Sequence, residues 1–156
     1  MFLTVHATAG AIIGQASPNL WLAFVIGFIS HFLLDLIPHG DEVLIKEKSA
    51  PSEQEIAKIK KLAMADIAAM SLVLLSLSWF DLIKFSLPVL AAIAGAILPD
   101  LITGFYLLTK FRWLKKYLEF HINLHYLSKK FAVSFRTGLV IQLIFLVLFL
   151  IVIILI

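Results

Sequence analysis

The last twenty residues, 137–156, constrain this chain most, because they contain no charged side chain. An α-helix needs about 20 predominantly apolar residues to cross the hydrocarbon core of a bilayer. Two further apolar runs, 62–80 and 87–108, reach that length with one aspartate each. Inside lipid the backbone must satisfy its own hydrogen bonds, so these runs predict an all-α membrane helical bundle.

The composition supports a lipid environment. Apolar residues make up 62% of the chain and charged residues 15%, with a mean hydropathy of +1.02, whereas soluble domains have about 45–50% and about 25%. The absence of cysteine excludes disulfides and thiolate metal sites. The net charge of +3 comes from basic residues beside the apolar runs, which indicates membrane topology rather than nucleic-acid binding.

We expect a single integral membrane domain, 1–156, with four to five membrane helices. The first segment, 2–16, has about 15 apolar residues and is short for a span; it lacks the basic n-region of a signal peptide. The run 20–37 is predicted to span. Small residues predict that these two segments pair closely as a hairpin through Gly10, Gly14 and Gly27.

The remaining segments have polar starts. Ser52 and Glu55 are spaced as a capping box, so a helix is predicted that starts amphipathic and enters the membrane at about residue 62. The helix 87–108 is expected to be interrupted at Pro99–Asp100. The run 110–130 is basic, amphipathic and aromatic, which is typical of a cytoplasmic helix lying at the membrane interface.

The distribution of basic residues predicts an orientation in the membrane. Five lysines lie between the second and third segments and seven Lys/Arg residues within 110–136, but only Lys84 lies between 80 and 87. By the positive-inside rule the lysine-rich regions are cytoplasmic and Lys84 is outside. We therefore expect a multi-pass protein of the cell inner membrane.

The stretch SHFLLDLIPHGDE carries the strongest chemical signal. His31 and Asp35 are four residues apart and share a helix face, which His39 continues if the helix persists past Pro38. Ionisable side chains inside a span cost several kcal/mol unless they are paired or hydrated. Imidazole and carboxylate are usual zinc ligands. The spacing therefore predicts a divalent metal ion, most simply zinc, in one or more copies.

Other polar residues are predicted to lie at the same membrane depth. The topology allows them to converge with His31 and Asp35 near the inner leaflet; they are His6, Asp66, Asp100, His121 and His125. All of them except Asp100 also have a simpler interpretation, which for His6 is a satisfied polar residue at a helix start. Asp66 serves equally well as a helix cap, and His121 and His125 as surface histidines.

Several of these residues also carry a family resemblance. The segments VHATAGAIIG, SHFLLDLIPHGD and AILPDLI, with an aspartate between the last two, resemble the YdjM-like family of membrane-bound metal-dependent hydrolases over about residues 5–101. HxxxD on a helix is also distantly similar to a ligand pair in zinc-dependent phospholipase C. The resemblance implies that His6, His31 and Asp35 are ligands, with Asp66 and Asp100 as further ligands or orienting groups. In the phospholipase a His-plus-acid pair follows; the candidate here is His121 with His125, which leaves the number of ions open.

The leading hypothesis is a metal-dependent hydrolase acting on a lipid-borne ester, most simply a phosphoester, at the cytoplasmic leaflet. An open coordination position would hold a water whose pKa is lowered towards about 7, and Asp66 or Asp100 would be the general base. Lys60, Lys61, Lys115 and Lys116 would attract an anionic headgroup. The alternatives are a small transporter or proton relay that uses the His/Asp array, and a structural protein with a metal staple. Whether the chain forms a homo-oligomer is left open.

Overall fold

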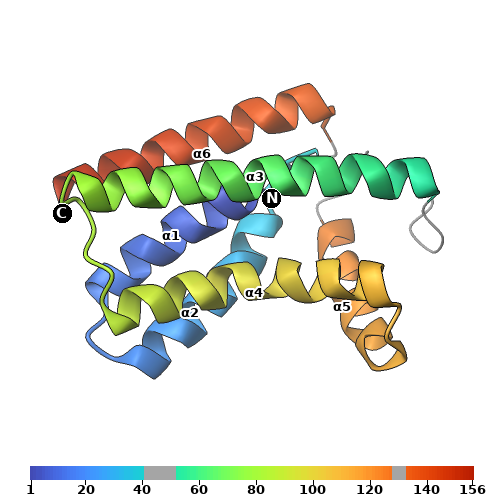
Figure 1. Cartoon of the computed structure of the whole chain (residues 1–156), viewed down its shortest axis with the longest axis horizontal. Helices are drawn as coiled ribbons and strands as arrows, with labels where there is room; N and C mark the ends of the chain where they lie inside the picture. Colours follow the sequence, from blue (N-terminus) through green and yellow to red (C-terminus); the bar gives the residue numbers. More distant parts are fainter. Residues whose placement is uncertain (41–51, 128–132) are drawn as a thin grey trace.

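The computed structural model describes residues 1–40, 52–127 and 133–156, with all of their side chains except those of 125–127. Within these ranges the regular elements are all helical, which confirms the all-α prediction (Figure 1). In chain order they are α1 (Leu3–Ala16), α2 (Leu20–Asp35), α3 (Glu53–Trp79), α4 (Leu87–Thr109), the 3₁₀ helix η2 (Arg112–Leu114), α5 (Lys115–Leu127) and α6 (Phe135–Leu155).

The predicted capping box at the start of α3 is confirmed. The Ser52 hydroxyl accepts a hydrogen bond from the Glu55 N–H at 3.3 Å, and the Glu55 carboxylate accepts one from the Ser52 N–H at 2.9 Å. Serines also cap α4 and α6, through Ser86 and Ser134. These bonds satisfy N–H groups that the first helical turn leaves without a partner.

Three helices, α3, α4 and α6, are long and apolar enough to cross a membrane, with 27, 23 and 21 residues. The shorter α2 has 16 residues and α1 has 14, or about 24 and 21 Å at 1.5 Å per residue. The prediction that 20–37 forms a full span is therefore wrong, because the helix is shorter than predicted. The helix ends at Asp35, because Pro38 disfavours helical geometry in the residue before it.

The short helix α1 lies at the centre of the bundle. It packs against α2, α3, α4 and α6 (Figure 1), and most of its residues are buried, including His6. The small residues of the run ATAGA (7–11) allow the surrounding helices to approach it. The core cluster built on Ala7 and Ala11 also includes Leu77 of α3 and Ile153 of α6.

The glycines join α1 and α2 to α4 rather than to each other. A Cβ atom on Gly10 would lie 2.9 Å from the Ala92 oxygen, and one on Gly14 would lie 2.3 Å from the Val89 Cα. A Cβ atom on Gly27 of α2 would lie 2.3 Å from the same Ala92 oxygen. The predicted packing of α1 against α2 is present, but these three glycines do not form that contact. All three glycines pack instead against the backbone of α4.

The predicted interruption at Pro99–Asp100 is also wrong, because α4 continues as one helix from Leu87 to Thr109. Pro99 has no N–H to donate to the carbonyl of Gly95. Other polar groups form hydrogen bonds to backbone carbonyls near the proline. His31 binds the carbonyl of Ala96, and the Thr103 hydroxyl binds that of Pro99. The proline therefore lies within the helix, next to the polar cluster described below.

The region 110–130 is only partly the predicted interfacial helix. Lys110 ends α4 in a left-handed conformation with φ of 55°, and α5 starts after η2, at Lys115. Trp113 is exposed, as expected at an interface, but Leu118 and His121 are buried. One face of α5 therefore packs against α2 and α4.

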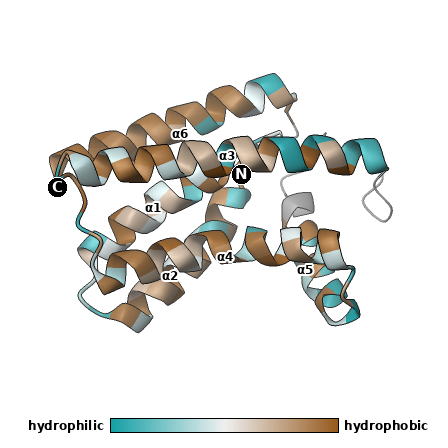
Figure 2. Ribbon diagram, in the orientation of Figure 1, coloured by the Kyte–Doolittle hydropathy of each residue, from teal (hydrophilic) through white to brown (hydrophobic). Residues whose placement is uncertain are grey.

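The outer surface is apolar along most of the bundle's length. Large exposed hydrophobic residues lie on α2, α3, α4 and α6, for example Trp21, Leu72, Leu90 and Leu143. Figure 2 shows brown, hydrophobic ribbon along α4 and α6 and teal, hydrophilic ribbon at the start of α3. Such a surface is typical of helices that face lipid rather than water.

Candidate metal centre

Four side chains from α2, α4 and α5 converge inside the bundle. They are His31, Asp35, Asp100 and His121, and one nitrogen or oxygen atom of each lies within 4.8 Å of the others. Tertiary structure thus joins the HxxxD pair of α2 to the PD motif of α4 and to a histidine of α5. The group could hold a metal ion.

Three of the four donor atoms lie at nearly equal distances from one another. The Asp35 Oδ2 is 3.0 Å from the His31 Nε2 and 3.2 Å from the His121 Nε2. The two Nε2 atoms are themselves 3.2 Å apart. In a tetrahedral zinc site with bonds of about 2.0–2.1 Å, neighbouring ligand atoms are about 3.3 Å apart. The spacing therefore fits a small tetrahedral ion.

The Nδ1 atom of each histidine ring, which points away from the cluster, forms a hydrogen bond with α4. The His31 Nδ1 lies 2.8 Å from the Ala96 carbonyl oxygen, which can only accept, so this nitrogen carries the hydrogen. The His121 Nδ1 lies 2.8 Å from the Thr103 hydroxyl, which donates its own hydrogen to the Pro99 carbonyl. In the neutral rings both Nε2 atoms therefore present lone pairs to the cluster. Metal-binding histidines are oriented in this way by their outer partners.

With both Nε2 atoms presenting lone pairs, the cluster requires a positive charge. Two imidazole lone pairs and a carboxylate oxygen face one another with no hydrogen among the three atoms. Such an arrangement is favourable only if a cation is shared, either an added proton on one ring or a metal ion. Phe32 packs edge-on against the rings of His31 and His121. This contact shields one side of the cluster with an apolar ring.

The second oxygen of Asp35 makes different contacts. Its Oδ1 forms an ion pair with the Met1 ammonium group at 2.7 Å and lies 3.2 Å from the His6 Nε2. The His6 ring also stacks on that of His31, with centroids 4.1 Å apart. The structure therefore places His6 beside the four-residue group, where it contacts and orients Asp35.

Asp100 forms the accessible side of the group. Its Oδ1 is 3.8 Å from the His31 Nε2, and its side chain is 27% exposed, whereas Asp35 is 1% exposed. Asp100 and His121 both line a cavity between α3 and α4. Water and small groups can therefore reach the cluster from this side.

Asp66 lies outside the four-residue group and caps α1. Its carboxylate accepts hydrogen bonds from the N–H groups of Leu3 and Thr4, at 2.5 and 3.2 Å, and from the Thr4 hydroxyl at 2.5 Å. A carboxylate at a helix start satisfies the first N–H groups and the positive end of the helix dipole. The capping interpretation of Asp66 is therefore the one its contacts support.

Of the remaining predicted ligands, His39 does not join the group. His39 is buried, but its Nδ1 binds the Ile37 carbonyl at 2.7 Å, and its own carbonyl accepts a hydrogen bond from Gln142. His125 belongs to α5, but its side chain lies outside the described residues.

Sequence reasoning missed three residues around the cluster. Thr103 and Ala96 orient the two histidines, and the only sequence signal for them is their position within a turn of Pro99. The third is Tyr117, whose ring centroid is 6.0 Å from that of His121. Its hydroxyl is buried without a hydrogen-bond partner among the described residues. Burial raises the pKa of Tyr117 above its ordinary value, so the hydroxyl remains a neutral donor.

Comparisons of the chain with protein-family models, with curated proteins and with solved structures found no match.

Proposed function

We propose that this protein is a membrane-embedded, zinc-dependent hydrolase of a lipid-borne ester, most simply a phosphoester, at the cytoplasmic side of the inner membrane. One observation carries the proposal. The Nε2 atoms of His31 and His121 and the Oδ2 of Asp35 converge within 3.2 Å of one another, and the outer hydrogen bonds of the two neutral rings leave both Nε2 lone pairs facing the carboxylate. The resemblance of the HxxxD and PD motifs to the YdjM-like family points to the same chemistry.

The residues have distinct roles in this proposal. His31, Asp35 and His121 would hold the ion, a set of three protein ligands such as catalytic zinc sites use. When bound, zinc lowers the pKa of a coordinated water to about 7 and polarises the substrate oxygen. Asp100 lies on the accessible side, where it takes a proton from the attacking water and returns it to the leaving alcohol.

Metal analysis of the detergent-purified protein tests the metal centre. We expect stoichiometric zinc in the native protein and its loss in His31→Asn, because the asparagine amide can still bind the Ala96 carbonyl but removes the Nε2 ligand. His39→Asn is the matched control. It makes the same change at another buried histidine whose Nδ1 binds a backbone carbonyl, and should retain the metal.

Headgroup release from phospholipid vesicles then tests the activity. We expect the native protein with zinc to release headgroup and His31→Asn to release none. Zinc bound equally well by the native protein and by His31→Asn would contradict the ligand assignment. A metal-free native protein would contradict the proposed zinc-dependent hydrolase activity.

A structural cluster is the second candidate, and the Met1 ammonium group favours it. This group supplies a positive charge 2.7 Å from Asp35 inside the bundle, which offsets part of the cost of burying that carboxylate. In this case the cluster would fasten α1, α2, α4 and α5 together without metal. The native protein would then be metal-free, and Asp35→Asn would lower its thermal stability without any enzymatic effect.

A further inference from the structure

A large apolar cavity lies between the first half of α3 and the second half of α4. Its volume is about 750 Å³, within the range of small-molecule binding sites. Most of its lining is aliphatic or aromatic, and includes Ile59 and Ala63 from α3 and Leu101 and Phe105 from α4. The start of α1 and one face of α5 complete the wall.

The cavity follows from the unequal lengths of the helices. At 1.5 Å per residue the 27-residue α3 is about 40 Å long and the 14-residue α1 about 21 Å. α1 starts where Asp66 caps it, in the middle of α3. Beyond that point no part of α1 separates α3 from α4, and Met1, Phe2 and Leu3 line the cavity.

The cavity opens on the surface that faces lipid. Met64 of α3 and Phe105 and Leu108 of α4 line it and are themselves more than half exposed. These side chains belong to two helices long and apolar enough to span a membrane. A molecule in the bilayer can therefore enter between α3 and α4 without crossing water.

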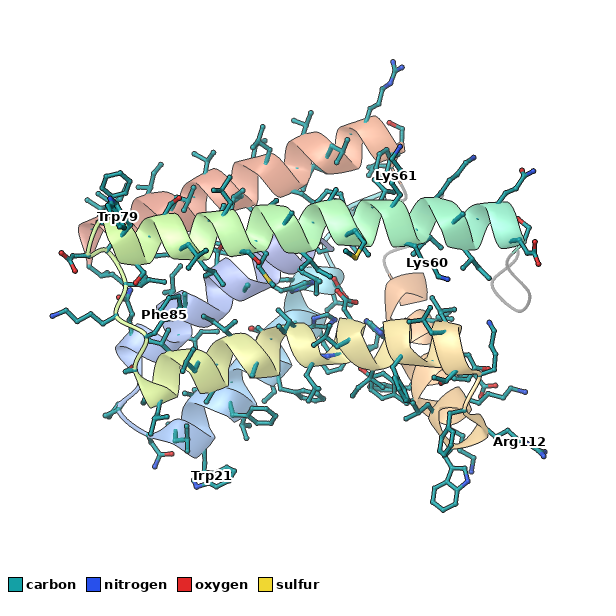
Figure 3. The ribbon with its side chains drawn as sticks, in the orientation of Figure 1. Trp21, Lys60, Lys61, Trp79, Phe85 and Arg112 are labelled. Carbon is teal, nitrogen blue, oxygen red and sulfur yellow. The ribbon has the colours of Figure 1, made fainter. Side chains whose placement is uncertain are left out.

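The other parts of the lining are polar and close to the metal centre. Asp100 and His121 line the cavity and belong to the four-residue group. Lys60 lines it from α3, whereas its neighbour Lys61 does not. Figure 3 shows the two lysines on opposite sides of α3, with Lys60 on the side that faces α4 and α5. The cavity therefore combines an apolar wall, the Lys60 ammonium group and the candidate centre.

We infer that this cavity binds an acyl chain of an anionic phospholipid that enters from the bilayer between α3 and α4. The chain lies along the apolar wall, Lys60 binds the phosphate, and the ester bond reaches Asp100 and His121. The hydrolysis of this lipid rests on the proposed function, whereas its binding in the cavity does not. It names the substrate class, a long-chain lipid phosphate.

Gly104 offers a direct way to fill the cavity. It lines the cavity from α4, and a Cβ atom built on it has no neighbour within 4 Å. Gly104→Leu therefore places a side chain into the cavity without displacing a packed helix. Ala94→Leu adds bulk at an exposed position of the same helix, outside the cavity lining, and is the matched control.

Photocrosslinking tests the inference. The native protein is placed in nanodiscs containing a trace of phosphatidate with a diazirine on one acyl chain, irradiated, and mapped by mass spectrometry. We expect labels on cavity-lining residues of α3 and α4 well above those on the exposed face of α6. Gly104→Leu should reduce cavity labelling to the α6 level, and Ala94→Leu should not change it.

A charge test uses the adjacent lysines. Lys60→Gln should reduce cavity labelling by phosphatidate about three- to tenfold, which lies within the range expected for one lost hydrogen bond of ordinary net strength at an exposed lysine. Lys61→Gln should leave it unchanged. A diacylglycerol probe with the same diazirine chain should not distinguish the two variants.

The possible results separate this inference from the proposed function. Labels distributed equally over α3, α4 and α6 would overturn the acyl-chain site even if zinc and hydrolysis are found. Cavity labels in a metal-free protein would support the site and reject the hydrolase. A native protein that is dimeric in the nanodisc and unlabelled in the cavity, and monomeric as Gly104→Leu, would mean that a second copy occupies the cavity and would overturn the inference.

Discussion

At the scale of single residues, the cluster depends on which ring nitrogen of each histidine carries the hydrogen. The Ala96 carbonyl and the Thr103 hydroxyl hold the Nδ1–H groups of His31 and His121, so that both Nε2 lone pairs meet at Asp35. Removing an outer partner of a metal-binding histidine commonly weakens metal binding about 10- to 100-fold.

Thr103→Val should therefore weaken zinc binding about 10- to 100-fold, because valine keeps the shape of threonine but cannot accept from the His121 Nδ1. Thr109→Val is the control. Its hydroxyl also binds the carbonyl four residues earlier on α4, at 2.8 Å, but lies at an exposed position. Competition with a chromogenic chelator measures both affinities; equal affinities would contradict an orienting role for Thr103.

Two aspartates that the sequence could not distinguish should respond differently to the same change. Asp66→Asn should lower the stability of the protein by about 1–3 kcal/mol, because the amide nitrogen replaces one of two accepting oxygens and leaves an N–H group at the start of α1 without its acceptor, while zinc and turnover remain. Asp100→Asn should leave thermal stability nearly unchanged but reduce turnover about 10²- to 10⁴-fold, the usual contribution of a general base. Thermal denaturation and vesicle hydrolysis measure the two effects. Loss of turnover in Asp66→Asn at full stability would reverse the assignment.

At the scale of helices, the close packing of α2 on α4 positions the site. His31 and Asp35 belong to α2, and Asp100 and Thr103 to α4, so the distance between these two helices sets the distances in the cluster. Gly27 lets the backbones approach, because a Cβ atom there would lie 2.3 Å from the Ala92 oxygen. The contact involves backbone, which cannot move aside as a flexible side chain can.

Gly27→Ala should therefore destabilise the protein by about 1–3 kcal/mol, the usual cost of overpacking, and weaken zinc binding as α2 and α4 separate. Gly104→Ala is the control on α4, where the added methyl group meets open space. It should be neutral or stabilising by up to about 1 kcal/mol, because alanine favours the helix. Thermal melts in detergent compare the variants; similar losses of stability in both would contradict the packing argument.

At the scale of the whole molecule, the basic residues mark one end of the bundle. Lys60, Lys61 and Arg112 lie towards one end, and Trp79 and Phe85 towards the other (Figure 3). The loop containing Lys84 follows α3 at that second end. The positive-inside rule then predicts that the lysine-rich end is cytoplasmic.

Single-cysteine labelling can test this orientation, because the chain contains no cysteine. In intact cells, a membrane-impermeant maleimide should label Lys84→Cys and should not label Lys61→Cys. After cell lysis both should be labelled. Labelling of Lys61→Cys in intact cells would place the basic end outside and would contradict a cytoplasmic site.

Several features followed from the sequence because they depend on local patterns. Long apolar runs must form helices in lipid, because the backbone has to satisfy its own hydrogen bonds there. The Ser52–Glu55 pair provides hydrogen-bond partners for backbone N–H groups at a helix start, and does so within four residues. The i, i+4 spacing of His31 and Asp35 places both on one helix face wherever that helix packs. The predicted metal pair is therefore contained in the four-residue group of the structure.

Only the tertiary structure decided which distant residues join that pair. The local sequence does not distinguish His121, whose Nε2 contacts Asp35, from His39, whose ring binds the Ile37 carbonyl. It also does not distinguish Asp100, which lies beside the cluster, from Asp66, which caps α1. These outcomes depend on α4 packing against both short helices and on α5 packing against α2 and α4. Both arrangements come from packing between segments far apart in the chain, which a local pattern cannot encode.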